Sequence, residues 1–199
     1  MTDTTPSHPR LILGSTSRYR RELLQRLHVP FDVASPDVEE TPRPEETPRQ
    51  LALRLALAKA HAVAKQHPSC VVIGSDQVAD LGGTPLGKPG DHQRAVQQLQ
   101  QMRGRTVVFQ TAVAVVHLDA GFEQVDLAPV QVRFRALSDA AIEHYLRTEQ
   151  PYDCAGSAKS EGLGISLLDA IHNDDPTALI GLPLIRTCHL LRAAGLVLP

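Results

Sequence analysis

Apolar residues near the start of the chain change their spacing within a few positions. Residues 11–14 form a continuous apolar run, typical of a buried strand, which ends at the small hydroxyl residues 15–17. Leu23, Leu24 and Leu27 then recur at the spacing of one helix face. The pattern predicts a strand, a turn and a helix in that order.

Apolar runs and helical repeats continue to alternate along the rest of the chain. Residues 30–48, rich in Pro, Glu and Asp, predict a loop, and Thr47 followed by Pro48 predicts the start of a helix that runs to about residue 66. The other predicted strands are 71–74, 106–118, 125–134 and 165–171, and the other predicted helices are 91–104, 138–149 and 183–194. We expect 106–118 and 125–134 to be antiparallel neighbours. This order indicates a mixed α/β fold around one sheet.

Length and composition favour a single domain. The chain has 199 residues, of which 42% are hydrophobic, so it can bury a core of its own. We expect the domain to span residues 10–199, after a frayed polar tail at 1–9 that lacks the layout of a secretory signal. The longest apolar runs fall far short of the ~20 residues that cross a bilayer. Three widely separated cysteines favour a reducing compartment, so we expect a cytoplasmic protein with no membrane partner.

Charge and aromatic content argue against nucleic-acid binding. The formal net charge is −2 and aromatic residues make up 4% of the chain, so neither a basic field nor many stacking platforms are present. An anion site must therefore be local. Arg18, Arg20 and Arg21 fall in the first turn of the N-terminal helix, where cations oppose the helix dipole. A bound phosphate would reverse that effect by accepting from helix N–H groups, Ser15 and the guanidinium groups, and an ordinary serine cap with solvated arginines is the alternative.

Further charged residues follow the second apolar run. Asp76 comes where we expect that strand to leave the sheet, and its carboxylate is suited to accept a proton from water or to bind Mg²⁺, although a turn-initiating aspartate is equally compatible. Lys88 lies on a rigid turn, and Lys59 lies at the edge of an apolar helix face, where either a phosphate contact or a snorkelling stem would explain it. The loop carboxylates are Glu39, Glu40, Asp153 and Glu161, one or two of which are candidate metal ligands. Zincin, nucleophile-elbow, Walker and dinucleotide-binding motifs are absent from the sequence.

In order and spacing, these landmarks resemble the Maf family over nearly the whole chain after the first ten residues. The matching segments are Leu11-Ile12-Leu13-Gly14-Ser15-Thr16-Ser17, Arg20, Glu22-Leu23-Leu24, Glu40-Thr41-Pro42, Lys59-Ala60, Ser75-Asp76-Gln77, Gly87-Lys88-Pro89, Ala155-Gly156, Glu161-Gly162 and Gly181-Leu182-Pro183-Leu184. The resemblance implies a mixed α/β fold like that of inosine triphosphate pyrophosphatases, with an elongated twisted sheet flanked by helices and two lobes around a central cleft. It also implies a nucleoside triphosphate pyrophosphatase that uses a divalent cation, Mg²⁺ or Mn²⁺, and a homodimer.

Roles for individual residues follow from the resemblance. Asp76 resembles the family's general base, and Glu40 with Asp76 would hold the metal. The residues that resemble triphosphate-binding groups are Ser15, Arg20, Lys59 and Lys88. Two positions depart from the family pattern, because Arg18-Tyr19 replaces the usual Pro-Arg and Val107 replaces a common histidine.

The first departure points to a subgroup of the family. Ser75-Asp76-Gln77 with an aromatic residue at position 19 resembles the members that act on 7-methyl-GTP. The base of that nucleotide is a cation, so the face of Tyr19 would attract it by a cation–π contact worth ~0.5 to 2 kcal/mol. Gln77 and Glu161 are expected to bind the same base.

Three other functions are compatible with the sequence. A dTTP or UTP pyrophosphatase of the same family would use the same phosphate groups. A nucleotide-binding regulator of cell division without catalysis would need the binding groups alone. An RNA-binding module built on residues 18–21 is the weakest of the three, because the rest of the chain has neither a basic stripe nor aromatics.

Overall fold

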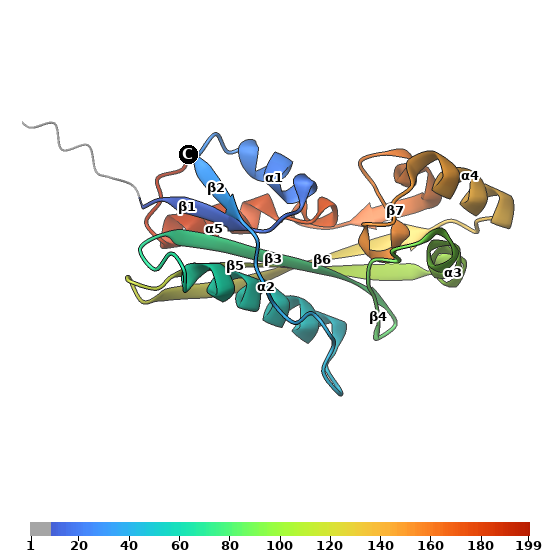
Figure 1. Cartoon of the computed structure of the whole chain (residues 1–199). Coiled ribbons are helices and arrows are strands. Elements are labelled where there is room, and N and C mark those ends of the chain that lie inside the picture. Colours follow the sequence, from blue (N-terminus) through green and yellow to red (C-terminus); the bar gives the residue numbers. More distant parts are fainter. Residues whose placement is uncertain (1–8) are drawn as a thin grey trace, which may run out of the picture.

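One mixed sheet of seven strands runs through the whole length of the molecule (Figure 1). The computed structural model describes residues 9–199, so residues 1–8 of the predicted tail lie outside the described part. The strands are β1 (Leu11–Gly14), β2 (Phe31–Ala34), β3 (Val71–Leu81), β4 (Thr84–Leu86), β5 (Thr106–His117), β6 (Phe122–Phe134) and β7 (Leu168–His172). Their order in the sheet is β2-β1-β3-β5-β6-β7, and β4 pairs with β3.

Five α-helices and three short 3-10 turns complete the described chain. The helices are α1 (Arg18–Gln25), α2 (Pro48–Ala64), α3 (His92–Met102), α4 (Asp139–Glu149) and α5 (Leu184–Ala193). The 3-10 turns are η1 (Ala155–Ser157), η2 (Leu163–Leu167) and η3 (Ala178–Ile180). Among these, no helix is both long and apolar enough to span a membrane.

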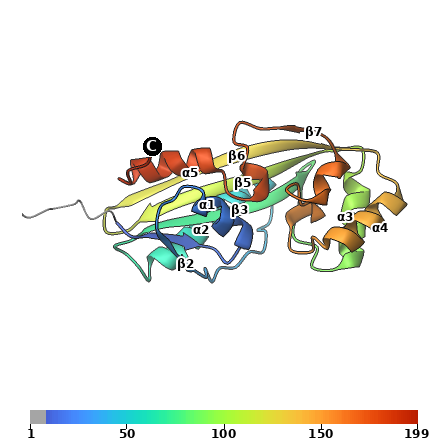
Figure 2. The ribbon, with the colours of Figure 1, turned by 90° about the horizontal axis from the view of Figure 1, so that it is seen from above.

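The helices divide the molecule into two ends that share the long strands β3, β5 and β6. At one end α2 packs on one face of the sheet, while α1 and α5 lie over the opposite face (Figures 1 and 2). At the other end α3 and α4 pack together against the sheet, with Phe109, Phe134 and Tyr145 in their core. The expected elongated sheet with two lobes is therefore the fold of this chain.

Local sequence signals explain where the helices around the cleft begin. The Ser17 hydroxyl accepts from the Arg20 amide at 3.4 Å and caps α1. Thr47 and Gln50 form a reciprocal capping box at the start of α2. Each helix therefore begins next to the loop that carries a candidate binding residue.

The edge of β3 that faces β1 is interrupted in the middle. β1 pairs with β3 in parallel over Val71–Gly74, and β4 pairs with it only over residues 79–81. Within the described chain, residues 75–78 have no strand partner on that edge, whereas β5 pairs with them on the other. The interruption leaves an opening in the sheet between the two ends of the molecule.

Most predicted elements are confirmed, and four are corrected. The expected antiparallel pair is β5 and β6. Residues 31–34 of the predicted loop form β2, a short half-exposed edge strand between Pro30 and Pro36 whose pattern is too brief to be read in sequence. The turn-rich stretch after position 82 contains β4, and the predicted strand 165–171 is η2 followed by β7, since strand pairing with β6 starts only at residue 168. The prediction that a strand ends before Asp76 is wrong, because pairing with β5 carries β3 on to Leu81.

Candidate active site

A cleft of about 730 Å³ lies at the interruption of the β3 edge. Its walls come from the β1–α1 turn, the loop before α2, α2 itself, the β4 region and the segment 153–161. The nine residues to which the resemblance gave a role all line this cleft: Ser15, Tyr19, Arg20, Glu40, Lys59, Asp76, Gln77, Lys88 and Glu161. Arg21 and Glu39, which the sequence also offered as candidates, do not line it. Segments far apart in the sequence therefore meet at one place.

The β1–α1 turn presents hydroxyl and guanidinium donors to the cleft. Ser15 Oγ accepts from the main-chain N–H of Ser17 at 3.2 Å and from Arg20 Nη1 at 3.4 Å. Arg20 Nε donates to the carbonyl oxygen of Gly181 at 2.9 Å, which fixes the guanidinium on the cleft wall. Burial lowers the pKa of Arg20, opposed by the charges of Asp76 and Glu40. The arginine thus faces two carboxylates across the cleft.

Lys59 links two acidic residues on separate segments. Its Nζ lies 2.6 Å from Asp76 Oδ1 and 2.7 Å from Glu40 Oε1. Lys59 and Asp76 are each only 6% exposed, so the ammonium is not a snorkelling head at the helix surface, and that alternative for Lys59 is wrong. The helical spacing from Leu51 and Leu55, which are buried on the same face of α2, carries Lys59 toward β3.

Glu40 reaches the cleft from a loop that Arg54 holds in place. The Arg54 guanidinium donates to both carboxylate oxygens of Glu46, at 2.5 and 2.8 Å, and to the main-chain carbonyl of Thr41 at 3.1 Å. The hydrogen bond from Arg54 is the largest cause that lowers the pKa of Glu46 to about 2. Burial acts to raise the pKa of Glu40 itself, but the Lys59 hydrogen bond and the charges of the nearby cations lower it overall.

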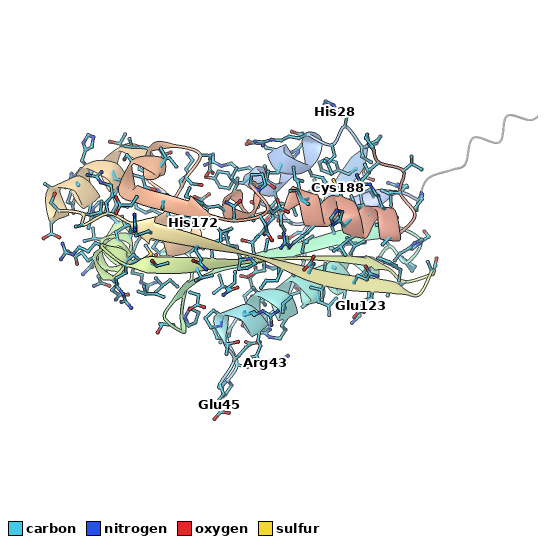
Figure 3. All side chains as sticks on the ribbon, turned by 180° about the vertical axis from the view of Figure 1, so that it is seen from behind. His28, Arg43, Glu45, Glu123, His172 and Cys188 are labelled. Carbon is cyan, nitrogen blue, oxygen red and sulfur yellow. The ribbon has the colours of Figure 1, made fainter. Side chains whose placement is uncertain are left out.

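The tip of the same loop projects away from the rest of the molecule. Figure 3 shows Arg43 and Glu45 at this tip. Glu39, a candidate loop carboxylate, accepts from the Thr41 amide at 2.9 Å and so serves the turn rather than the cleft. Only Glu40 of the acidic pair at 39 and 40 lines the cleft.

Asp76 and its two neighbours in β3 face opposite sides of the sheet. Asp76 points to α2, where it meets Lys59. Ser75 points the other way and donates to the carbonyls of Ala112 and Gly181 at 2.8 and 3.0 Å. Gln77 shares that side, and its amide nitrogen donates to the carbonyls of residues 178 and 179. The open strand edge makes both faces accessible from one cleft.

Tyr19 lies on the first turn of α1 and is half-buried. The Arg18 guanidinium lies over its ring, 4.7 Å from the centroid, and donates to its hydroxyl at 2.6 Å. Burial raises the pKa of the Tyr19 hydroxyl. Because a cation of the chain itself already lies over this ring, the residue has the geometry for cation–π contact.

Lys88 and Glu161 line the cleft from the segments around β4 and η2, and both are exposed. The charge of Lys88 also contributes to the lowered pKa of Glu40, which lines the same cleft. In residues 9–199, Lys88 makes no ion pair with a carboxylate. Its ammonium is therefore available to an anionic ligand.

The two carboxylates that meet at Lys59 fit a metal ion that is bound partly by the protein and partly by the substrate. Glu40 and Asp76 bind one ammonium at 2.7 and 2.6 Å, so one oxygen of each is close to the other. No cluster of three or more His, Cys, Asp or Glu side chains suited to a metal occurs in the described chain. Mg²⁺ commonly takes one or two protein carboxylates and completes its shell with water and substrate phosphates. Two carboxylates without a third suit that mode of binding.

Comparison with known proteins decides the family. The family described as Maf-like protein matches residues 10–194. The chain belongs to the Maf-like family. A relative in Polaromonas sp. (strain JS666), named 7-methyl-GTP pyrophosphatase, is 73% identical over 197 residues, which cover 99% of this chain and 90% of the relative.

Two further relatives of this Maf-like chain have the same name. That of Albidiferax ferrireducens is 71% identical and the alignment covers 96% of each chain. That of Aromatoleum aromaticum is 57% identical over 96% of this chain and 99% of the relative. Among solved structures, a HAM1 protein from Coxiella burnetii is 14% identical with a TM-score of 0.43 over 65% of this chain and 75% of that one.

The sequence did not single out several residues that shape this Maf-like cleft. Arg54 and Glu46 anchor the loop of Glu40. Thr111, on the neighbouring strand β5, accepts a hydrogen bond from the Gln77 amide. Its one sequence signal is that Gln110 and Thr111 form a polar pair within a largely apolar strand, but that signal does not reveal a partner 34 positions away.

Proposed function

We propose that this Maf-like protein hydrolyses 7-methyl-GTP to 7-methyl-GMP and pyrophosphate. The observation that carries the proposal is the placement of Asp76 in a cleft with Ser15, Arg20, Lys59 and Lys88. Relatives of 57 to 73% identity named 7-methyl-GTP pyrophosphatase support this choice of substrate. Removal of modified nucleotides before they enter nucleic acids would be the cellular purpose.

Asp76 is proposed as the base that activates water. Lys59 holds Asp76 Oδ1 at 2.6 Å. The other oxygen, Oδ2, has no hydrogen-bond partner in residues 9–199 and keeps some contact with solvent, although the residue as a whole is buried. The free oxygen is therefore able to take a proton from water for attack at the α-phosphorus. Lys59 orients the carboxylate and keeps positive charge beside the reacting phosphate.

The triphosphate is proposed to bind along the cationic side of the cleft. Arg20 and Ser15 supply donors at the start of α1, where the helix dipole also favours an anion. Lys88 would meet the phosphates from the opposite side. These groups neutralise the charge that develops on departing pyrophosphate.

A divalent cation, Mg²⁺ or Mn²⁺, is proposed to join the substrate. Glu40 and Asp76 would hold it, and it would supply charge neutralisation for the phosphates. A homodimer and a cytoplasmic location, which rest on the resemblance and on composition, are also proposals. No nucleic-acid partner is proposed.

The base would bind at the other end of the cleft. The Tyr19 ring would stack with the cationic 7-methylguanine, as it does with Arg18 in this structure. Gln77 and Glu161 would accept from the donor edge of the base. Stacking on a cation-binding ring favours the methylated base over ordinary guanine.

Pyrophosphate release from a nucleotide panel tests the proposal. The panel is 7-methyl-GTP, GTP, UTP and dTTP with Mg²⁺, and the largest kcat/KM is expected for 7-methyl-GTP. A larger value for UTP or dTTP would favour the other activity of the family. Binding of nucleotides without turnover of any of the four would instead support a non-catalytic regulator.

Asp76→Asn is the variant that tests the base. We expect kcat to fall by about 10² to 10⁴, the range that a general base contributes. Asparagine cannot accept the proton. Affinity for the nucleotide, measured by calorimetry, is expected to stay within several-fold, because asparagine has nearly the same size and shape as aspartate beside Lys59. Turnover at the parent rate would remove Asp76 from the mechanism.

A further inference from the structure

We infer that Thr111 is a positioning residue that fixes the side-chain amide of Gln77, so that its carbonyl oxygen alone faces the nucleotide base. Gln77 lines the cleft, whereas Thr111 lies behind it on β5, directly opposite in the strand register, and is fully buried. The inference deepens the proposed function and rests on it for the identity of the base.

The contacts of the Gln77 amide nitrogen determine its orientation. Nε2 donates to Thr111 Oγ1 at 2.9 Å and to the main-chain carbonyls of Ala178 and Leu179, each at 3.0 Å. All three partners act as acceptors. An amide NH₂ group has two protons, so both are used on the protein side and none is left for a ligand.

The Thr111 hydroxyl can only accept from Gln77 because its proton is used elsewhere. Thr111 Oγ1 donates to the Ala178 carbonyl at 3.0 Å. If the amide were turned around, Gln77 Oε1 would face two carbonyl oxygens and a hydroxyl whose proton is already donated. An acceptor oxygen placed against other buried acceptors forms no hydrogen bond with them. This loss of hydrogen bonds disfavours the turned orientation.

The side-chain carbonyl oxygen of Gln77 is the end of the amide that remains available to a ligand in the cleft. Oε1 has no hydrogen-bond partner in the part of the chain that the structure describes, and it is not a buried atom. Glu161, across the same cleft, also presents acceptors only when ionised. Thr111, together with the carbonyls of Ala178 and Leu179, therefore defines Gln77 as an acceptor toward the cleft.

The two acceptors, Gln77 Oε1 and the Glu161 carboxylate, select the kind of base edge that fits. A guanine-type edge carries two adjacent donors, the ring N1–H and the 2-amino group. A uracil or thymine edge carries one N–H between two carbonyl oxygens, so one acceptor of the protein would face an oxygen. Rejection through an unpaired polar group is an effective source of specificity. With one of its three acceptors removed, the amide would turn more readily, its NH₂ would pair with that oxygen and the discrimination would weaken.

Thr111→Val and Thr111→Ser test the inference as a matched pair. Valine keeps the shape of threonine without the hydroxyl, and serine keeps the hydroxyl. For valine we expect the ratio of kcat/KM for 7-methyl-GTP over UTP to fall by about five- to tenfold, the scale of one lost hydrogen bond. Most of the change is expected in KM, and serine is expected to keep the parent ratio. An equal loss for both substrates, or the same ratio in both variants, would overturn the inference.

A second measurement tests the amide without any substrate. In the parent protein the two Gln77 side-chain amide protons, assigned by their loss in Gln77→Ala, are expected to exchange slowly with solvent in NMR spectra. Thr111→Val is expected to speed that exchange at least severalfold, and unchanged exchange would overturn the inference. Should the parent protein prefer UTP while this exchange responds as expected, the proposed substrate fails and the positioning role of Thr111 stands.

Discussion

Lys59 connects three segments of the chain through a single ammonium group. It extends from α2, binds Asp76 on β3 and binds Glu40 on the loop before the helix. A lysine that is 6% exposed is stable only when its charge is compensated, and here two carboxylates do so. The geometry of the proposed base therefore depends on a residue of another element.

Replacing Lys59 with methionine tests this dependence. The variant leaves Asp76 buried without its cation, so we expect a loss of about 3 kcal/mol in the free energy of unfolding, the scale for breaking a buried ion pair. Urea denaturation measures it. Lys65→Met, at an exposed position at the end of the same helix, is the control and is expected to change stability by less than about 0.5 kcal/mol. Equal effects of the two substitutions would contradict a structural role for the Lys59 ion pairs.

Helix α2 and strand β3 approach each other closely at Gly74. A Cβ atom at this position would lie 2.2 Å from the Ala56 carbonyl oxygen and 2.5 Å from the Ala60 nitrogen. Both of these atoms belong to the backbone of α2, which cannot move aside as a side chain would. The glycine thus sets the distance at which Lys59 meets Asp76.

Gly74→Ala is therefore expected to push α2 away from the sheet. We expect a loss of stability of about 1 to 3 kcal/mol, as for overpacked cores, together with a fall in kcat because the Lys59 to Asp76 contact lengthens. Urea denaturation and steady-state kinetics measure the two effects. Gly87→Ala is the control for stability, because nothing lies within 4 Å of the added methyl group. A variant at position 74 with the stability of this control and the kcat of the parent would show that the packing tolerates a side chain.

The loop that carries Glu40 is anchored by an ion pair with a defined pH dependence. The Arg54 hydrogen bond is the first cause of the lowered pKa of Glu46, about 2 against an ordinary value of 4.5. A carboxylate whose folded-state pKa is depressed stabilises the fold above its unfolded pKa and loses that contribution as the pH falls through the folded pKa. The anchor is therefore complete at neutral pH.

Arg54→Met removes the anchor and reveals this pH dependence. The difference in unfolding free energy between parent and variant is expected to be constant above about pH 5 and to shrink as the pH falls from about 4.5 toward 2. Urea titrations at a series of pH values measure it. Arg94→Met, which removes an exposed arginine at the start of α3, is the control and is expected to differ little from the parent. A difference in unfolding free energy that stays constant down to pH 2 would show that the stabilisation by Arg54 does not come from its ion pair with Glu46.

At the scale of the whole molecule, the cleft joins two ends that share three long strands. Residues 15–20 lie at the α1 end, and 153–161 lie at the end of α3 and α4 (Figure 2). Both stretches line the same cleft. A nucleotide bound there would contact both ends at once.

Hydrogen exchange with the proposed product tests that view. With 7-methyl-GMP, pyrophosphate and Mg²⁺ present, we expect slower amide exchange in 15–20 and in 153–161 together. The β5–β6 turn at 118–121, which does not line the cleft, is the internal control. At a ligand concentration 100 times its Kd, the fold should gain about 2.7 kcal/mol. Protection confined to one of the two stretches would contradict a ligand that spans the cleft.

Sequence patterns were most informative where the signal is local. The caps at Ser17 and Thr47, the strand at 11–14 and the paired strands β5 and β6 follow from short-range periodicity and hydrogen-bonding chemistry. They were less informative for β2 and for the far half of β3, because those strands depend on pairing with segments distant in the chain. Resemblance to the family identified all nine candidate site residues that now line the cleft.

The sequence by itself determined which residues carry charge, which faces are apolar and where most helices begin, since these properties depend on neighbours within a few positions. Only the tertiary structure decided that Lys59 joins Asp76 to Glu40, that Arg54 anchors a loop and that Thr111 orients Gln77. Each of these contacts links separate elements. Their distances are set by the register of the sheet and by the close packing of α2 on Gly74, which no local pattern records.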